Sequence, residues 1–262
     1  MTQTTTSADG TTIAYEKSGT GPALIIIGGA FNTRQSAADL ARVLAAHFSV
    51  LTYDRRGRGD SDEASSSSPS SREREIEDLA ALIDAAGGSA CVYGHSSGGA
   101  LALEATAAGL PISKVAAYEP PYNALAADFG TVTDWRERIQ TALDSGDRGE
   151  AAALFLRGSG MDAAAVEGLS QAPWWPGMLG VAHTLPYDLG LMGDGTVPVE
   201  RFSRIAVPTL LLSGGDSPAW AAESASQIAS AISDAKHVVV QGQDHNVDPA
   251  TIAPELSDFF RA

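Results

Sequence analysis

Residues 94–98 read Gly-His-Ser-Ser-Gly and place a serine at the centre of a Gly-x-Ser-x-Gly pattern. An apolar run precedes this pattern, and a helix-forming stretch over residues 101–108 follows it. At a sharp strand-to-helix turn the central residue is strained, and its side chain is exposed at the amino end of the helix. Gly94 and Gly98 would prevent a collision between strand and helix. The pattern therefore predicts that Ser96 is an activated nucleophile, with an ordinary glycine-rich turn as the alternative.

A serine hydroxyl is a weak nucleophile at neutral pH and needs an adjacent base that an acid holds in the right tautomer. Of the five histidines, His245 is the best placed, because it follows the last predicted strand in a loop at the carboxyl edge of the sheet. An exposed loop histidine is the alternative interpretation. His95 occupies a variable position of the serine motif, and we expect it to pack beside the nucleophile.

The acid has more than one candidate. Asp216 follows a predicted strand through a Gly-Gly pair, and one helix and one strand fit between it and His245. The order Ser96, Asp216, His245 is typical of chains with this turn. Glu119 also ends a predicted strand and is the second candidate. Asp244 adjoins the histidine, and we expect it to be unable to reach the Nδ1 atom from there.

A tetrahedral intermediate also needs two N–H donors for its developing oxyanion. The amide of Ser97, at the start of the helix, is the first candidate. The second is the amide of Ala30, because the strand over residues 24–27 ends in glycines that let backbone approach a substrate closely.

Strands and helices alternate on both sides of the serine motif. Two β-like segments around Asp9-Gly10 predict an antiparallel hairpin, and continuous apolar runs predict strands that are buried on both faces. Alternation with helical stripes predicts βαβ units and a parallel sheet. Besides the strand before Ser96, we predict strands over residues 4–7, 11–16, 22–27, 48–53, 115–119, 208–213 and 236–241, and helices over 36–47, 72–86, 101–108, 219–232 and 250–261.

Residues 122–200 interrupt this alternation, because they contain helical patches but no long buried strand. We interpret them as a helical insertion into one α/β core made of residues 1–121 and 201–262. The serine-rich residues 62–71 predict a surface loop, because the segment is short, with a linker between domains as the alternative.

Composition excludes several classes of partner. The chain has 262 residues, of which 44% are apolar and 19% charged, as in ordinary globular proteins. Its formal net charge of −15 repels nucleic acid and anionic membranes, so we expect neither as a partner. The lone Cys91 excludes an internal disulfide and is expected in the core. The polar residues 1–10 and the absence of a long apolar stretch predict a cytoplasmic protein. No sequence pattern indicates the oligomeric state.

With the serine motif, residues 54–61, Asp-Arg-Arg-Gly-Arg-Gly-Asp-Ser, resemble the D-x-R-G-x-G-x-S loop of the α/β-hydrolase superfamily. The resemblance spans nearly the whole chain. It implies a mainly parallel eight-stranded sheet flanked by helices, with a helical cap inserted after strand six. Many members have His-Gly at the oxyanion loop, where this chain has Gly28-Gly29. The backbone donor survives that change, but the local hydrogen bonding of the histidine is lost.

The resemblance implies a serine hydrolase that cleaves a carboxylic ester or related acyl bond of a small organic molecule through an acyl-enzyme, without a metal or organic cofactor. Lactones, thioesters and activated amides suit the same machinery. C–C bond hydrolysis, perhydrolysis, acyl transfer and a catalytically silent ligand-binding protein are the alternatives. We expect the cap to set substrate choice. The candidates for substrate contact are Phe31, His95, Tyr122, Trp174, Trp175 and His183.

Overall fold

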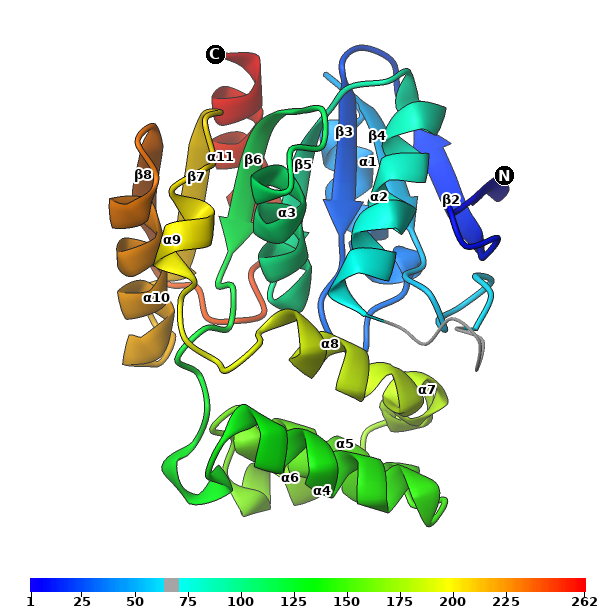
Figure 1. Ribbon diagram of the computed structural model, residues 1–262, viewed down its shortest axis with the longest axis vertical. Helices are drawn as coiled ribbons and strands as arrows, with labels where there is room; N and C mark the ends of the chain where they lie inside the picture. The colour runs from blue at the N-terminus through cyan, green and yellow to red at the C-terminus, as the bar shows by residue number, and fades with distance from the viewer. Residues whose placement is uncertain (64–70) are drawn as a thin grey trace.

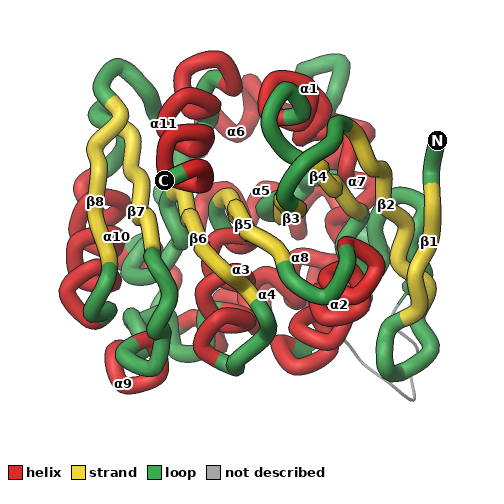
Figure 2. Tube along the Cα trace, turned by 90° about the horizontal axis from the view of Figure 1, so that it is seen from above, coloured by secondary structure: helices red, strands yellow, loops and turns green. Residues whose placement is uncertain are grey.

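The computed structural model describes residues 1–63 and 71–262, so most of the serine-rich loop, residues 64–70, lies outside the described residues. One eight-stranded sheet has the order β1-β2-β4-β3-β5-β6-β7-β8 (Figures 1 and 2). β2 is antiparallel to both of its neighbours, and all other pairs are parallel. The predicted mainly parallel sheet is therefore confirmed. The strands are β1 (Gln3–Thr6), β2 (Thr12–Ser18), β3 (Ala23–Ile27), β4 (Ser49–Tyr53), β5 (Ala90–His95), β6 (Ile112–Tyr118), β7 (Thr209–Gly214) and β8 (Ala235–Val240).

Helices cover both faces of the sheet. α1 and α11 pack on one face, and α2, α3 and α10 pack on the other (Figure 2). The helices are α1 (Ala38–Leu44), α2 (Arg72–Ala86), α3 (Ser97–Ala107), α4 (Val132–Asp144), α5 (Arg148–Gly158), α6 (Ala163–Ser170), α7 (Trp175–Val181), α8 (Leu185–Leu191), α9 (Val199–Phe202), α10 (Ala219–Ala231) and α11 (Pro249–Arg261). Among the described residues, none of these helices combines the length and apolar character needed to cross a bilayer.

The apolar run of β3 shows why the central strands need two layers of helices. Ile25 and Ile27 belong to the cluster under α2 and α3, whereas Leu24 and Ile26 belong to the cluster under α1 and α11. Side chains alternate along a strand, so each layer covers every second residue. Full burial of one such side chain contributes about 1.5–3 kcal/mol. The strand's carboxyl end is thereby fixed in a rigid frame.

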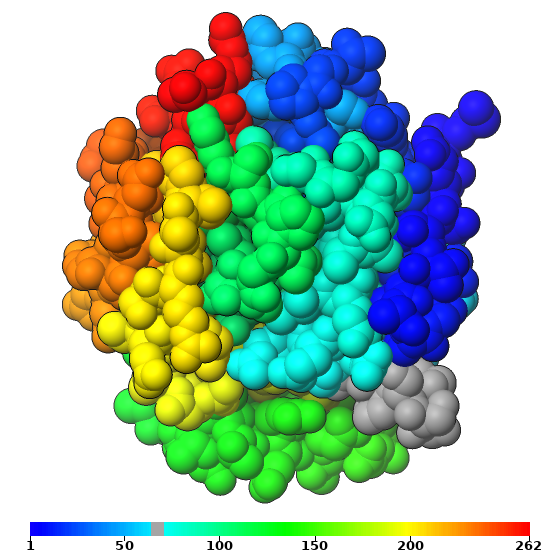
Figure 3. Space-filling model, turned by 45° about the horizontal axis from the view of Figure 1, so that its top comes forward, coloured from blue at the N-terminus to red at the C-terminus, as the bar shows by residue number. Residues whose placement is uncertain are grey.

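We call residues 122–200 the cap. In this segment α4 to α8 follow one another between β6 and β7, at the carboxyl end of the parallel strands, toward which the arrowheads of β3 and β6 point in Figure 1. Figure 3 shows the green segment closing that end of the core. α9 straddles the predicted boundary at Glu200 and packs on α3 and α10 of the core.

Candidate active site

Ser96 occupies the turn between β5 and α3 with a φ of 54° and a ψ of −125°. A residue with a side chain rarely adopts such a positive φ, because its backbone is then strained, and the surrounding structure must stabilise it. A Cβ on Gly94 would lie 2.2 Å from the Gly98 carbonyl oxygen, and one on Gly98 would lie 2.4 Å from that of Ile27. Neither position accepts a side chain, because backbone is in the way on both sides. The structure therefore has the sharp turn that the glycine spacing predicted.

The loop after β3 lies directly against this turn. A Cβ on Gly29 would be only 2.9 Å from the Cβ atom of Ser96. Neither the amide of Ala30 nor that of Ser97 donates a hydrogen bond to a residue within the described part of the chain. Ser97 is the first residue of α3, where amides have no partner in the helix. Both predicted oxyanion donors are thus backbone N–H groups near Ser96 that no described residue accepts from.

His245 is bound to a buried carboxylate. Its Nδ1 atom lies 2.6 Å from Oε2 of Glu119, whose side chain is completely buried. The other oxygen, Oε1, accepts hydrogen bonds from the Gly214 amide at 2.7 Å and from the Ser217 hydroxyl at 2.5 Å. Because a carboxylate only accepts, the Nδ1 atom of His245 carries the proton and the Nε2 atom is left as the basic one.

Electrostatics keep Glu119 ionised. Burial opposes the charge, but the hydrogen bonds from His245, Ser217 and the Gly214 amide outweigh it and hold the pKa of Glu119 below its ordinary value. Glu119 also has a φ of 46°, and the other described non-glycine residues with a positive φ are Ser96, Phe31 and Asn123. Strain at Ser96 and in the two loops that carry Phe31 and Glu119 is typical of a functional site.

Asp216 is not the partner of His245, which corrects the prediction. Its side chain is exposed, and the turn from Gly214 to Ser217 directs hydrogen-bond donors at Glu119 instead. The register of the sheet explains the difference. His95 pairs with Tyr118 across β5 and β6, so Ser96 and Glu119 leave adjacent strands at the same level. β7 lies one strand further away.

The loop that carries His245 is held at three consecutive carbonyls. The Gln243 oxygen accepts from the amide of Asp216, and the Asp244 oxygen accepts from the hydroxyl of Tyr118. The carbonyl of His245 itself accepts from Nε2 of His95 at 2.8 Å. These donors follow or end β7, β6 and β5, so the sheet fixes the histidine loop from below. Asp216 therefore supports the loop through its backbone.

His95 directly precedes Ser96, and its ring packs against the histidine loop. Its ring stacks on Tyr118 with 5.8 Å between centroids and lies 4.9 Å from the ring of His245. Burial, with a smaller contribution from the neighbouring His245, lowers the pKa of His95 to about 4. It is therefore neutral at pH 7, and its one proton sits on Nε2, which donates to a carbonyl. The side chain therefore supports the loop that carries His245.

The residues predicted to contact substrate have different partners in the structure. Phe31 packs edge-on against Phe155 of the cap, with 5.4 Å between centroids. Tyr122 is fully buried and packs against Phe202, so it belongs to the core and does not line an accessible pocket. His183 bonds through Nε2 to the Gly57 carbonyl at 2.9 Å and thereby joins the cap to the core.

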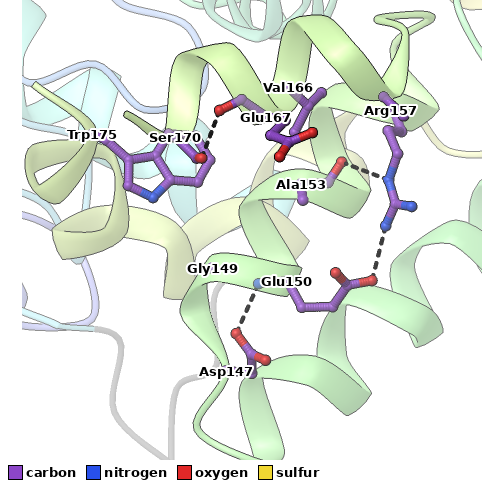
Figure 4. A pocket seen from close by; sticks show the side chains of 10 residues that line it. Asp147, Gly149, Glu150, Ala153, Arg157, Val166, Glu167, Ser170 and Trp175 are labelled. Atoms are coloured by element: carbon purple, nitrogen blue, oxygen red, sulfur yellow. Dashed lines mark hydrogen bonds and ion pairs between the residues drawn. The ribbon is translucent and has the colours of Figure 1, made fainter. Parts of the chain in front are cut away.

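The two predicted cap tryptophans lie elsewhere in the cap. Trp174 is 52% exposed. Trp175 lines a cavity of about 440 Å³ between α5, α6 and α7 (Figure 4). Ser170 and the ion-paired Arg157 and Glu150 also line it. None of the residues that line this cavity belongs to the cluster around Ser96. Trp175 therefore lines a pocket within the cap, and substrate contact by either tryptophan stays a prediction.

Trp220 is a neighbour of the site that the sequence did not indicate. It is the second residue of α10, and its ring centroid lies 6.1 Å from that of His245. The available signal was its position after β7, in a loop-to-helix junction at the carboxyl edge of the sheet.

The loop after β4 turns three arginines into the interior. Arg55, Arg56 and Arg58 are each at most 3% exposed. Gly57 and Gly59 have φ values of 77° and 53°, which allow the tight winding that points these side chains inward. Their carboxylate partners come from α2, from the hairpin and from the cap.

Comparison with known proteins agrees with this architecture. The model of the alpha/beta hydrolase family matches residues 21–255. The crystal structure of an alpha/beta hydrolase from Sphaerobacter thermophilus DSM 20745 is 50% identical, with a TM-score of 0.92, over 98% of this chain and 100% of that one. A hydrolase from Pseudomonas aeruginosa PA01 is 25% identical over 100% and 98%, with a TM-score of 0.81. A thermophilic esterase from Thermogutta terrifontis is 21% identical over 100% and 97%, with a TM-score of 0.74. With this fold and these matches, the chain belongs to the alpha/beta hydrolase family.

Proposed function

We propose that this hydrolase is a serine esterase that cleaves a carboxylic ester of a small organic molecule through an acyl-enzyme. The observation that carries the proposal is the arrangement of Ser96 on a strained turn beside a histidine loop whose Nδ1 proton is held by Glu119. Ser96, His245 and Glu119 have the residue types of a nucleophile, its base and the acid that orients the base. The order along the chain is serine, acid, histidine.

In the first half-reaction the Oγ atom of Ser96 attacks the ester carbonyl carbon, and its proton passes to Nε2 of His245. The carbonyl oxygen becomes an oxyanion, which the amides of Ala30 and Ser97 stabilise. Collapse of this intermediate breaks the bond to the alkoxy group. The protonated His245 supplies the proton with which the alcohol leaves, and the acyl group stays on Ser96.

In the second half-reaction His245 takes a proton from water, and the resulting hydroxide attacks the acyl carbonyl. The same amides stabilise the second oxyanion. Its collapse releases the carboxylic acid, and His245 returns the proton to Oγ of Ser96. Glu119 stays ionised throughout and stabilises the positive charge on His245 in both halves.

Apolar side chains border the proposed site. Phe31 follows the oxyanion donor Ala30, and Trp220 packs beside His245. These rings favour a substrate with apolar groups next to its carbonyl. The thermophilic esterase from Thermogutta terrifontis has the same fold, and for this reason we choose an ester among the possible acyl compounds.

A fluorophosphonate probe, which phosphonylates activated serines, tests the proposal. We expect a single adduct that peptide mapping assigns to Ser96, and none in Ser96→Ala. His245→Ala should retain the hydroxyl but react much more slowly. Hydrolysis of short p-nitrophenyl esters should disappear in the same variants. A folded wild-type protein with neither adduct nor turnover would contradict the proposal and favour a ligand-binding protein. C–C cleavage or perhydrolysis without ester turnover would replace the substrate class.

A further inference from the structure

Arg58 is a buried cation that bonds to the loop beside the nucleophile. One guanidinium nitrogen, Nη1, donates to the carbonyl oxygen of Gly29 at 2.6 Å and, at a longer 3.3 Å, to that of Asn32 in the same loop. The other two nitrogens bind the cap: Nε donates to Oγ1 of Thr184 at 3.0 Å, and Nη2 donates to Oδ2 of Asp188 at 2.7 Å. The side chain is 1% exposed, so water does not compete for these bonds. Arg58 therefore joins the oxyanion loop to the cap.

The two neighbouring arginines bind differently. Arg55 donates from Nε and Nη2 to the two carboxylate oxygens of Glu75, both at 2.6 Å. Arg56 donates from the same two nitrogens to the carboxylate of Asp78 at 2.8 and 2.7 Å. Such two-pronged pairs are the usual arrangement for a buried guanidinium. Arg58 makes only one bond to its carboxylate and directs another nitrogen at a backbone carbonyl. Charge pairing with Asp188 does not explain the bond from Arg58 to the Gly29 carbonyl.

The geometry of a peptide group explains it. The Gly29 carbonyl and the Ala30 N–H belong to one planar peptide unit, and in a trans peptide the two groups point in opposite directions; the described chain contains no cis peptide bond. When Arg58 binds the carbonyl, it fixes the N–H of Ala30 on the opposite side. A cation on the oxygen also withdraws electron density, which makes the N–H a stronger donor.

Asp188 of α8 connects both oxyanion donors. Its Oδ2 atom binds Arg58, while Oδ1 accepts from the hydroxyl of Ser97 at 2.7 Å and from Nη1 of Arg55 at 2.6 Å. Burial opposes ionisation of Asp188, but the charges of Arg58 and Arg55 and the Ser97 hydrogen bond outweigh it and lower the pKa of Asp188. One carboxylate of the cap is thus bonded to the residue that carries one donor and, through Arg58, to the peptide that carries the other.

We propose that Arg58 is a positioning residue for the oxyanion hole, that it orients the Gly29–Ala30 peptide, and that Asp188 of the cap anchors it. The proposal rests on the proposed serine hydrolase function. Arg58 touches no reacting atom. Many members of the family have a histidine where this chain has Gly28, and Arg58 supplies the hydrogen bonding to this loop in its place. Through Asp188, the cap becomes a structural part of the catalytic centre.

Kinetics of Arg58→Lys and Arg58→Ala on a p-nitrophenyl ester test this role. An oriented oxyanion donor acts in the transition state, so kcat should fall by roughly tenfold to a hundredfold while KM changes little. Inhibition by a trifluoromethyl ketone, whose adduct with serine carries an oxyanion, should weaken by the same factor. Lysine keeps the charge but has one nitrogen, so it cannot bind Gly29, Thr184 and Asp188 together.

Arg56→Lys is the matched control. Arg56 is equally buried in the same loop, but its partners among the described residues are Asp78, Asp9 and the Arg74 carbonyl, none of which belongs to the site. Its loss should lower the thermal midpoint and leave kcat and the ketone inhibition constant unchanged. Free guanidinium, at concentrations far below those that unfold the wild type, should raise kcat of Arg58→Ala and not that of the control.

A folded Arg58→Lys with wild-type kcat and wild-type ketone inhibition would overturn the proposal, as would a change in KM alone. Should Arg58→Ala fail to fold, the lysine variant still decides through the parallel loss of kcat and ketone affinity. A wild-type protein without turnover and without a fluorophosphonate adduct at Ser96 would overturn the proposed function, and this inference with it.

Discussion

The Nδ1 atom of His245 lies 2.6 Å from Oε2 of Glu119, although the two residues are far apart in the chain. The carboxylate follows β6, the strand next to β5, which ends at the turn that carries Ser96. It is buried and accepts hydrogen bonds from three groups, so both its charge and its direction are fixed. An acid with these contacts can hold the histidine in the tautomer that a serine nucleophile needs.

The acid can be assigned by substitution. Glu119→Gln removes the charge that stabilises protonated His245, and we expect kcat to fall by roughly 10²- to 10⁴-fold. Asp216→Asn, the matched control, keeps the backbone amide that binds Gln243 and should lose at most about twofold in kcat, as surface substitutions usually do. Initial rates on one ester, with circular dichroism to verify folding, distinguish the two. The reverse ranking would restore Asp216 as the acid.

Stability should depend on pH through His95. Its pKa is about 4 in the folded protein, against an ordinary value of 6.5, so between these values the unfolded chain binds more protons than the folded one. Unfolding is therefore favoured as the pH falls from 6.5 to 4, by up to about 3 kcal/mol. Urea unfolding of the wild type and of His95→Gln at several pH values measures the difference. Parallel pH profiles for the two proteins would contradict the prediction.

The close approach at Gly29 should matter more for activity than for folding. In Gly29→Ala the new methyl group would lie 2.9 Å from the Cβ atom of Ser96 and 3.1 Å from the His95 carbonyl oxygen. We expect kcat/KM to fall by roughly tenfold or more, because the oxyanion loop and the nucleophile must separate. Stopped assays at low substrate concentration give this ratio directly.

Gly168→Ala is the control for that substitution. Gly168 lies within α6, and a Cβ there would have no atom within 4 Å. Alanine should stabilise the helix by about 0.5–1 kcal/mol and leave kcat/KM unchanged. If both alanine variants lose activity equally, the loss does not come from crowding at Ser96.

The hydroxyl of Tyr118 should help to hold the histidine loop. Tyr118→Phe removes its 2.6 Å hydrogen bond to the Asp244 carbonyl and leaves the ring that stacks on His95. We expect a loss of about 1 kcal/mol in the free energy of unfolding and a modest decrease in kcat. Thermal unfolding and initial rates measure both. An unchanged thermal midpoint would show that the bond contributes nothing.

The strands and the sharp turn at Ser96 could be predicted from the sequence, because each depends on a local pattern. The run from Leu24 to Ile27 needs burial on both faces, and the glycines around Ser96 allow only a tight turn. The helical character of the cap was also readable, since the segment lacks strand patterns.

The acid could not be chosen from sequence, because Glu119 and Asp216 both follow strands at the same edge of the sheet. The choice depends on register and on the direction of the loop. Glu119 follows Tyr118, which pairs with His95, and its backbone turns into a positive φ. The bond from Arg58 to the Gly29 carbonyl could not be predicted either, because it joins two loops that only the folded sheet brings together.

Trapping the acyl-enzyme tests the central claim most directly. Wild-type protein is mixed with an ester that deacylates slowly, quenched in acid during turnover, and digested for mass spectrometry. The proposed mechanism predicts the acyl mass on the peptide that contains Ser96, with fragments that assign it to this residue, and its absence in Ser96→Ala. Turnover of the ester with no acyl group on Ser96, or with the group on another residue, would contradict the mechanism.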